Sequence, residues 1–391
     1  MAFQWLLGAR VATNLGNAIA PVALAFAVLD LTGSAVDLGI VVGARSIALV
    51  VLLLFGGVLA DRLPRAVILQ GASFAAALTQ ALIAVSVLGG FATLPLLLVL
   101  SVLNGAGAAV SIPAVLSITP QTVPTPMLRQ ANAVVRMAVT TAMTVGASAG
   151  GAVAGVAGPG WALALGAVTF AAAGVGYAGM TRHVTVPRTS SARPLTELRE
   201  GWTEFRARTW VWVVVLQFMM VNAAMVGGTQ VLGPVVADST IGRPAWGLVL
   251  GVQAVGAFLG AFVAGRWHPR RPLFVGVLAT FSEALPLLML AVAPQFVALL
   301  VAMFINGMLM EQFGVAWDTT MQQHIPADKL ARVYSYDAIG SVLAIPIGEM
   351  TVGPIAAGAG TEATLLGAAG LIVVATAAAL LSRGVRTLSS R

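Results

Sequence analysis

Residues 104–124 have the sequence NGAGAAVSIPAVLSITPQTVP, and residues 306–326 have the related sequence NGMLMEQFGVAWDTTMQQHIP. Both stretches begin with Asn-Gly and end at a proline twenty residues later, at an offset of 202 residues. The same offset relates Leu128 to Leu330, Gly146 to Gly348 and Gly151 to Gly353. A spacing kept over so long a stretch indicates that the chain is duplicated in parallel, with one copy in each half.

The composition is that of a membrane protein. Of the 391 residues, 59% are hydrophobic and 9% are charged, whereas soluble domains carry about 25% charged residues. Crossing a hydrocarbon core of roughly 30 Å takes about 20 apolar residues. Twelve such stretches lie near residues 7–28, 38–60, 66–89, 93–117, 133–157, 160–180, 209–235, 244–266, 272–292, 296–321, 334–358 and 362–383. We therefore predict an all-α membrane protein with twelve transmembrane helices in two pseudo-symmetric six-helix bundles.

The positions of Arg and Lys predict the orientation, because cytoplasmic loops carry an excess of basic residues. With the N-terminus inside, every cytoplasmic loop is basic, whereas the outer loops hold one basic residue, Arg243. We expect a multi-pass protein of the cell membrane with both termini cytoplasmic. The net charge of +7 then reflects topology and attraction to anionic lipid. No nucleic-acid partner is expected, since no module that reads nucleic acid is present.

The duplication and a basic middle segment predict three parts. Residues 1–180 form an N-terminal six-helix bundle, residues 181–208 a cytoplasmic linker, and residues 209–391 a C-terminal six-helix bundle. Thr196–Arg208 has the pattern of a short amphipathic helix. The linker is too short for a catalytic domain, and we expect the protein to be a monomer.

The loop after the second span, residues 57–65, has the sequence GVLADRLPR. It resembles the signature loop Gly-x-Leu-Ala-Asp-Arg-x-Gly-Arg-Arg of the major facilitator superfamily, although Pro64 replaces its second glycine and Ala66 its final basic residue. The resemblance implies the major facilitator fold. It also implies a role in conformational change for Gly57, Asp61, Arg62 and Arg65. A glycine permits close helix packing, and a carboxylate is favoured opposite a helix N-terminus.

Residues of the second half resemble one branch of that superfamily. They include Trp317-Asp318, Ile325-Pro326, Leu330-Ala-Arg332 and Ser335-Tyr-Asp337, and the branch contains enterobactin exporters and macrolide efflux pumps. This resemblance implies export, and a gating role for Asp318, Arg332 and Asp337. Gly146-Ala-Ser-Ala-Gly150-Gly151 resembles the glycine-rich motif of the antiporters, with Ala147 in place of proline. Close helix packing is an alternative explanation of Gly146 and Gly150.

Ionisable residues inside the spans are divided between the two halves. The N-terminal half holds cations (Arg10, Arg45, Arg136) and the C-terminal half holds carboxylates (Glu283, Glu311, Asp318, Asp337, Glu349). A charge at mid-bilayer costs about 2.5–3.5 kcal/mol, so each needs a partner or a wet cavity. In the superfamily, helices 1, 4, 7 and 10 line the central cavity. The resemblance therefore implies a substrate cavity near Arg10, Asn14, Asn17, Asn104, Gln217, Asn222, Asn306 and Glu311.

A carboxylate in a desolvated site can alternate between protonated and charged forms and so couple transport to protons. We predict this role for Glu311 first and Glu349 second, with Arg136 or Arg10 as the cation that favours the charged form in one conformation. The alternative is a set of static ion pairs that hold the bundle together. The fourth span lacks the arginine found there in proton antiporters of the superfamily, so Arg136 or Arg10 would have to substitute for it.

No motif indicates an enzyme. His183, His268 and His324 lie far apart in the sequence, and neither a P-loop nor a Gly-x-Ser-x-Gly elbow occurs, so no cofactor or metal is expected. We predict a secondary active transporter that exports a small amphipathic molecule (antibiotic, drug or siderophore class) by proton antiport with alternating access. The expected partners are this substrate, protons and membrane lipid. Two alternatives stay open: an importer of the same fold driven as a proton symporter, and a non-transporting membrane sensor or scaffold.

Overall fold

The computed structural model describes residues 2–60, 64–119, 122–181, 202–203, 205–267 and 269–388. Twelve helices in these ranges are long and apolar enough to cross a membrane. No strand occurs among the described residues. The prediction of an all-α protein with twelve transmembrane helices is therefore confirmed.

Large apolar side chains are exposed on helices of both halves. Val156, Val297 and Leu381 expose 87%, 69% and 72% of their surface, respectively. In water, each square ångström of apolar surface left unburied forgoes roughly 25 cal/mol. Contact with lipid chains removes that cost, so these surfaces suit a protein embedded in a bilayer.

The chain packs into two compact units. Unit 1 comprises Met1–Thr189 and Ala237–Gly251, and unit 2 comprises Ser190–Val236 and Val252–Arg391. The predicted bundles at residues 1–180 and 209–391 remain predictions. Most of the predicted linker at 181–208, with its amphipathic helix, lies outside the described residues.

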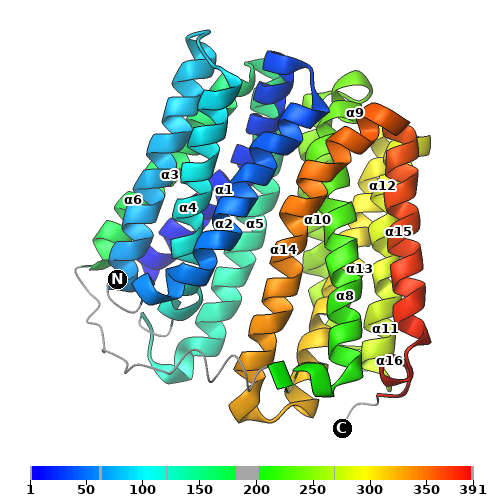
Figure 1. The fold of residues 1–391 in the computed structure, drawn as a ribbon. Helices are drawn as coiled ribbons and strands as arrows, with labels where there is room; N and C mark the ends of the chain where they lie inside the picture. The colour runs from blue at the N-terminus through cyan, green and yellow to red at the C-terminus, as the bar shows by residue number, and fades with distance from the viewer. Residues whose placement is uncertain are drawn as a thin grey trace. The chain divides into compact units, whose positions relative to one another are not determined.

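Unit 1 is built mainly from six long helices (Figure 1). These are α1 (Ala2–Thr32), α2 (Ala35–Ala60), α3 (Arg65–Leu88), α4 (Leu94–Ile118), α5 (Leu128–Val156) and α6 (Pro159–Thr181), with a 3-10 turn η2 (Thr125–Met127) before α5. Helix α6 packs along α1 and α3, α2 along α4, and α5 along α1. Gly33, Gly90 and Gly158 close the short turns between helices with positive φ angles of 65°, 71° and 93°, a conformation that glycine adopts at little cost.

One hydrophobic cluster joins four helices of unit 1. Leu6 of α1, Leu69 of α3, Ile118 of α4 and Tyr177 of α6 are each at most 2% exposed and pack together. Burial of side chains this large contributes roughly 1.5–3 kcal/mol each. The cluster fixes the four helices around the Tyr177 ring, which also borders the cavity described below.

Unit 2 contains the remaining long helices. They are α8 (Thr209–Val226), α11 (Pro272–Ala279), α12 (Ala284–Val292), α13 (Phe296–His324), α14 (Ala327–Ala359) and α15 (Thr361–Leu381), followed by the short α16 (Arg383–Thr387). A π-helical turn η3 (Gly227–Leu232) joins α8 to α9 (Gly233–Ser239), and a 3-10 turn η4 (Thr280–Glu283) joins α11 to α12. Helix α10 (Arg243–Ala264) begins in unit 1 and continues into unit 2. Helix α14 packs along α8, and α13 packs along α11 and α12.

Aromatic rings form much of the core of unit 2. Phe218 of α8 stacks on Phe313 of α13 with ring centroids 4.4 Å apart, and Trp210 meets Trp317 edge to face at 5.7 Å. Stacked and edge-to-face aromatic pairs contribute about 0.5–1.5 kcal/mol beyond the area that they bury. These contacts hold α13, which carries Asn306, against α8.

Candidate functional site

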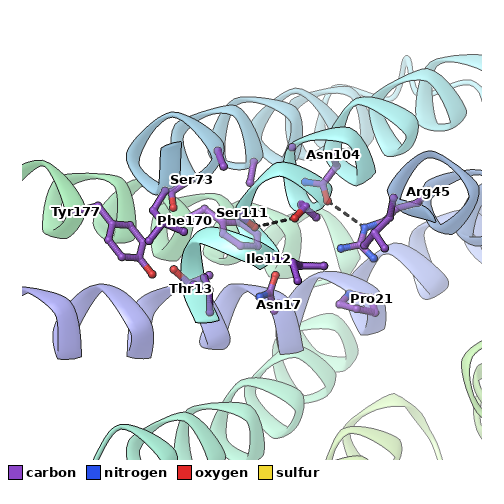
Figure 2. A pocket seen from close by; sticks show the side chains of 17 residues that line it. Thr13, Asn17, Pro21, Arg45, Ser73, Asn104, Ser111, Ile112, Phe170 and Tyr177 are labelled. Atoms are coloured by element: carbon purple, nitrogen blue, oxygen red, sulfur yellow. Dashed lines mark hydrogen bonds between the residues drawn. The ribbon is translucent and has the colours of Figure 1, made fainter. Parts of the chain in front are cut away.

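A cavity of about 240 Å³ lies inside unit 1 between α1, α2, α3, α4 and α6. Its polar lining residues are Thr13, Asn17, Arg45, Ser73, Asn104, Ser111 and Tyr177 (Figure 2). Pro21, Ile112, Val115 and Phe170 supply apolar wall. Sites for drug-sized molecules measure about 300–1,000 Å³, so this cavity suits the polar head of such a molecule or a smaller ligand. Of the predicted substrate-cavity residues, the structure brings Asn17 and Asn104 together here.

Arg45 is the cation of this cavity. Its Nε donates a hydrogen bond to Oδ1 of Asn104 over 3.0 Å, and Nδ2 of Asn104 donates to Oγ1 of Thr79 over 3.1 Å. Thr79 in turn donates to the carbonyl of Ala75 over 2.9 Å. The chain of bonds fixes the direction of the guanidinium side chain at the cavity (Figure 2). A guanidinium held in an apolar wall is a strong recognition element for a carboxylate, a phenolate or another anionic group.

Tyr177 adds a hydrogen-bonding group to the cavity. Its side chain is 1% exposed, and its hydroxyl makes no hydrogen bond within the described part of the chain. Figure 2 shows this hydroxyl pointing toward Thr13 across the cavity. Buried hydroxyls are nearly always hydrogen-bonded, so a hydroxyl left open here is suited to pairing with a ligand.

Asn306 in unit 2 occupies the position that Asn104 holds in unit 1. Nε2 of Gln253 on α10 donates to Oδ1 of Asn306 over 2.7 Å, as Arg45 on α2 donates to Asn104. The following glycines also correspond. A methyl group on Gly105 would overlap the carbonyl oxygen of Arg45, and one on Gly307 would overlap that of Gln253.

The structure shows that the duplication has two offsets. Asn104 and Asn306 differ by 202 residues, whereas their partners Arg45 and Gln253 differ by 208 (253 minus 45). Leu15 and Ala223 also differ by 208, and their carbonyls receive the equivalent glycines Gly146 and Gly348. The first two helices of each half therefore follow one spacing and the fourth and fifth another. A search for a single period in the sequence misses Gln253 for this reason.

The other predicted cavity residues lie elsewhere. Gln217 is buried in unit 2, where its Nε2 donates to Thr280 over 2.6 Å and to Thr376 over 3.2 Å. Nδ2 of Asn14 donates to the carbonyl of Arg10 one turn earlier, over 2.8 Å. Arg10, Asn14, Asn222 and Glu311 are half-buried, Arg136 is exposed and Glu349 is buried. Their predicted roles in substrate binding or proton coupling stay predictions.

The predicted gating residues of unit 2 are joined to aromatic side chains. Nε1 of Trp317 donates to Asp337 over 3.1 Å, and the Tyr334 hydroxyl donates to Asp318 over 2.9 Å. Burial, followed by the neighbouring Asp318, raises the pKa of Tyr334 above its usual value, so this hydroxyl remains a donor throughout the physiological range. The side chain of Arg332 is outside the described set.

In unit 1, the predicted loop residues Asp61 and Arg62 lie outside the described residues, Gly57 lies within α2, and Arg65 is the first residue of α3. Gly146 and Gly150 allow α5 to approach α1. A Cβ atom on Gly146 would lie 2.8 Å from the carbonyl oxygen of Leu15, and one on Gly150 would lie 3.1 Å from Cα of Ile19. These contacts explain the glycines by helix packing within unit 1.

Residues 6–349 match the family model of the Major Facilitator Superfamily. The chain belongs to this superfamily. Its members are transporters, so the chain is a membrane transporter and not an enzyme. Within the described residues, no group of three or more His, Cys, Asp or Glu side chains could hold a metal ion. His183 and His268 lie outside that set.

Two enterobactin exporters illustrate the relatives in the superfamily. The chain is 24% identical to EntS of Salmonella typhimurium over 364 residues, which cover 89% of this chain and 86% of the exporter. It is also 24% identical to EntS of Escherichia coli O139:H28 over 378 residues, covering 93% and 89%. These matches span nearly the full length of both proteins.

Solved superfamily structures share the fold. An inward-facing bacterial homologue of the human lysosomal transporter Spinster matches with a TM-score of 0.78 at 17% identity, over 99% of this chain and 96% of the other. The nucleoside transporter NupG matches with a TM-score of 0.74 at 14% identity, over 96% and 98%. These likenesses show the major facilitator fold, as the sequence resemblance predicts.

Proposed function

We propose that the protein is a proton-coupled exporter of a small amphipathic molecule with an acidic or phenolic group. The cavity of unit 1 carries this proposal: Arg45 offers a positive charge, Tyr177 an open hydroxyl, and Phe170 an apolar face. Antibiotics, drugs and siderophores that combine aromatic rings with ionisable oxygens have this chemistry. Likeness to enterobactin exporters supports both the direction and the substrate class.

The distribution of ionisable residues supports coupling to protons. Spanning helices of unit 1 carry Arg10 and Arg45, whereas those of unit 2 carry the carboxylates Glu311 and Glu349. A carboxylate can pick up a proton outside and release it inside as access alternates, while the cations of unit 1 stay charged and hold an anionic substrate. In this scheme, proton entry returns the transporter after each export step. Glu311 and Glu349 remain the sequence-based candidates for the proton carrier.

An importer with the same fold is the principal alternative. The nucleoside transporter NupG and a transporter of the POT family in complex with 5-aminolevulinic acid share the fold, so the fold alone sets no direction. A non-transporting sensor or scaffold is the other alternative. The three functions differ in how cells respond to a collapsed proton gradient.

Accumulation in an efflux-deficient bacterial host tests the proposal. Cells that express the wild-type chain should accumulate less of a labelled macrolide or catecholate siderophore than cells with an empty vector, and an uncoupler should abolish the difference. Greater accumulation in energised cells would identify an importer. Equal accumulation with and without the protein, across both classes of compound, would favour a sensor or scaffold. Arg383→Gln, at an exposed position in α16, is the matched control for substitutions of Arg45.

A further inference from the structure

Glu283 lies beside Asn306 in the interior of unit 2. Its side chain is 8% exposed, and it ends the 3-10 turn η4 between α11 and α12. Asn306, which is fully buried, is the polar side chain next to the carboxyl group of Glu283. Three residues from three helical segments thus meet in this interior: Gln253, Asn306 and Glu283.

Two atoms of this group lack ordinary hydrogen bonds. Oε2 of Glu283 and Nδ2 of Asn306 are both buried, and neither has a partner of ordinary geometry among the described residues. The Oδ1 atom of Asn306 is already occupied by Gln253. The position and charge of Asn306 are therefore fixed from α10, and its amide is left facing the carboxyl group.

No other charged group faces Glu283 from the segments that pack against η4. Helices α11 and α12 contain no ionisable residue, and the one in α15 is Glu362 in the first turn. Helix α13 carries Glu311, Asp318 and His324, but only burial and Asn306 act on the Glu283 carboxyl group. A carboxylate without a counter-ion in such a place is unfavourable in its charged form, so the group holds a proton here.

The equivalent group in unit 1 has a different composition. There Nδ2 of Asn104 donates to the neutral hydroxyl of Thr79, and the hydrogen-bond network is complete between α2, α3 and α4. The same helix contacts can thus be stabilised without a carboxyl group. Unit 2 has an ionisable group where unit 1 has a hydroxyl, and that difference requires a reason other than packing.

We propose that Glu283 is a proton-binding site of unit 2, positioned by Asn306 and Gln253. In one state its carboxylate takes one proton from a hydronium ion, giving the neutral acid and water. In the other state the acid returns one proton to water, and Nδ2 of Asn306 stabilises the carboxylate that remains. Glu283 is then a carrier in addition to, or in place of, Glu311 and Glu349. The inference rests on the proposed function only in assuming that proton movement drives transport.

Infrared spectroscopy of the purified full-length protein in lipid nanodiscs tests this site without any substrate. Wild-type protein should show the carbonyl stretch of a protonated carboxylic acid near neutral pH, and Glu283→Gln should lose this band. Glu311→Gln should keep it. Glu283→Asp, which retains an acid, should keep a band at a shifted frequency and provides a second test if the glutamine variant does not fold.

A band that survives unchanged in Glu283→Gln would overturn the proposal. A companion measurement separates this failure from failure of the proposed function. With the band assigned to Glu283, loss of at least tenfold of gradient-driven macrolide or catecholate transport in Glu283→Gln supports proton carriage. Wild-type transport in that variant would overturn carriage by Glu283 while leaving export by the protein intact.

Discussion

Asn104 and Asn306, 202 residues apart, make the same hydrogen bond in the two units: each accepts at Oδ1 from a side chain of the second helix of its half. The donors are Arg45 over 3.0 Å and Gln253 over 2.7 Å. The glycine after each asparagine packs against the carbonyl of that same donor residue. The Asn-Gly pair is therefore a helix-packing device that was duplicated with the fold, whereas the charges around it have diverged.

Replacing either asparagine should destabilise its unit. Asn104→Ala removes two hydrogen bonds, one of them from the charged side chain of Arg45, and Asn306→Ala removes the bond from Gln253. Loss of a buried hydrogen-bond partner costs roughly 1–3 kcal/mol. The measurement is the melting temperature in detergent, with Asn132→Ala at an exposed position of α5 as the control. Equal melting temperatures for all three variants would contradict this account.

Gly307→Ala should be far more damaging than Gly314→Ala on the same helix. A methyl group on Gly307 would overlap the backbone of Gln253, which cannot move without shifting α10, whereas a methyl group on Gly314 would meet no atom within 4 Å. Overpacking of this kind costs typically 1–3 kcal/mol or more. The yield of monodisperse protein from membranes measures the effect. Similar yields of the two variants would show that the helices separate easily.

Tyr177→Phe should reduce transport without reducing stability. The Tyr177 hydroxyl has no hydrogen-bond partner in the described structure, so removing it eliminates a buried unsatisfied group and leaves the ring packing intact. If the hydroxyl pairs with substrate, transport efficiency should fall about tenfold, equivalent to roughly 1.4 kcal/mol. Transport rates and melting temperatures are compared for the same preparations. A lower melting temperature with unchanged transport would assign the hydroxyl to the fold.

Tyr334 should remain protonated at a pH at which free tyrosine ionises. Its pKa is raised by burial and by Asp318, so its contribution to stability is present below the ordinary pKa of about 10 and is lost only as the pH passes the raised folded value. At about pH 11, wild-type and Tyr334→Phe proteins should therefore show the same tyrosinate absorbance. A smaller absorbance in the variant would mean that Tyr334 ionises normally.

The general architecture could be predicted from the sequence because lipid imposes it. Twelve long apolar stretches and a repeat with an offset of 202 residues were sufficient for the fold, since backbone groups in a bilayer must be satisfied within helices. Asn17 and Asn104 were also placed correctly as neighbours of one cavity. Polar residues in apolar helices are conspicuous, and this explains why they could be found.

The direction of each side chain could not be predicted from hydropathy. Helices that are apolar on all sides carry little information about which face is turned inward. Gln217 was expected in a substrate cavity, and the structure places it in hydrogen bonds to Thr280 and Thr376. Glu283 was recognised as an intramembrane charge without a role. Its place beside Asn306 depends on the 3-10 turn η4, which no sequence pattern indicated.

The most direct test of proton-driven export through the unit 1 cavity is transport into inside-out membrane vesicles with an imposed pH gradient. Wild-type vesicles should accumulate a labelled catecholate siderophore or macrolide when their interior is acidic. Arg45→Gln vesicles should accumulate at least tenfold less, and Arg383→Gln vesicles should match the wild type. Accumulation that does not depend on the gradient, or that is unaffected by loss of Arg45, would contradict the account.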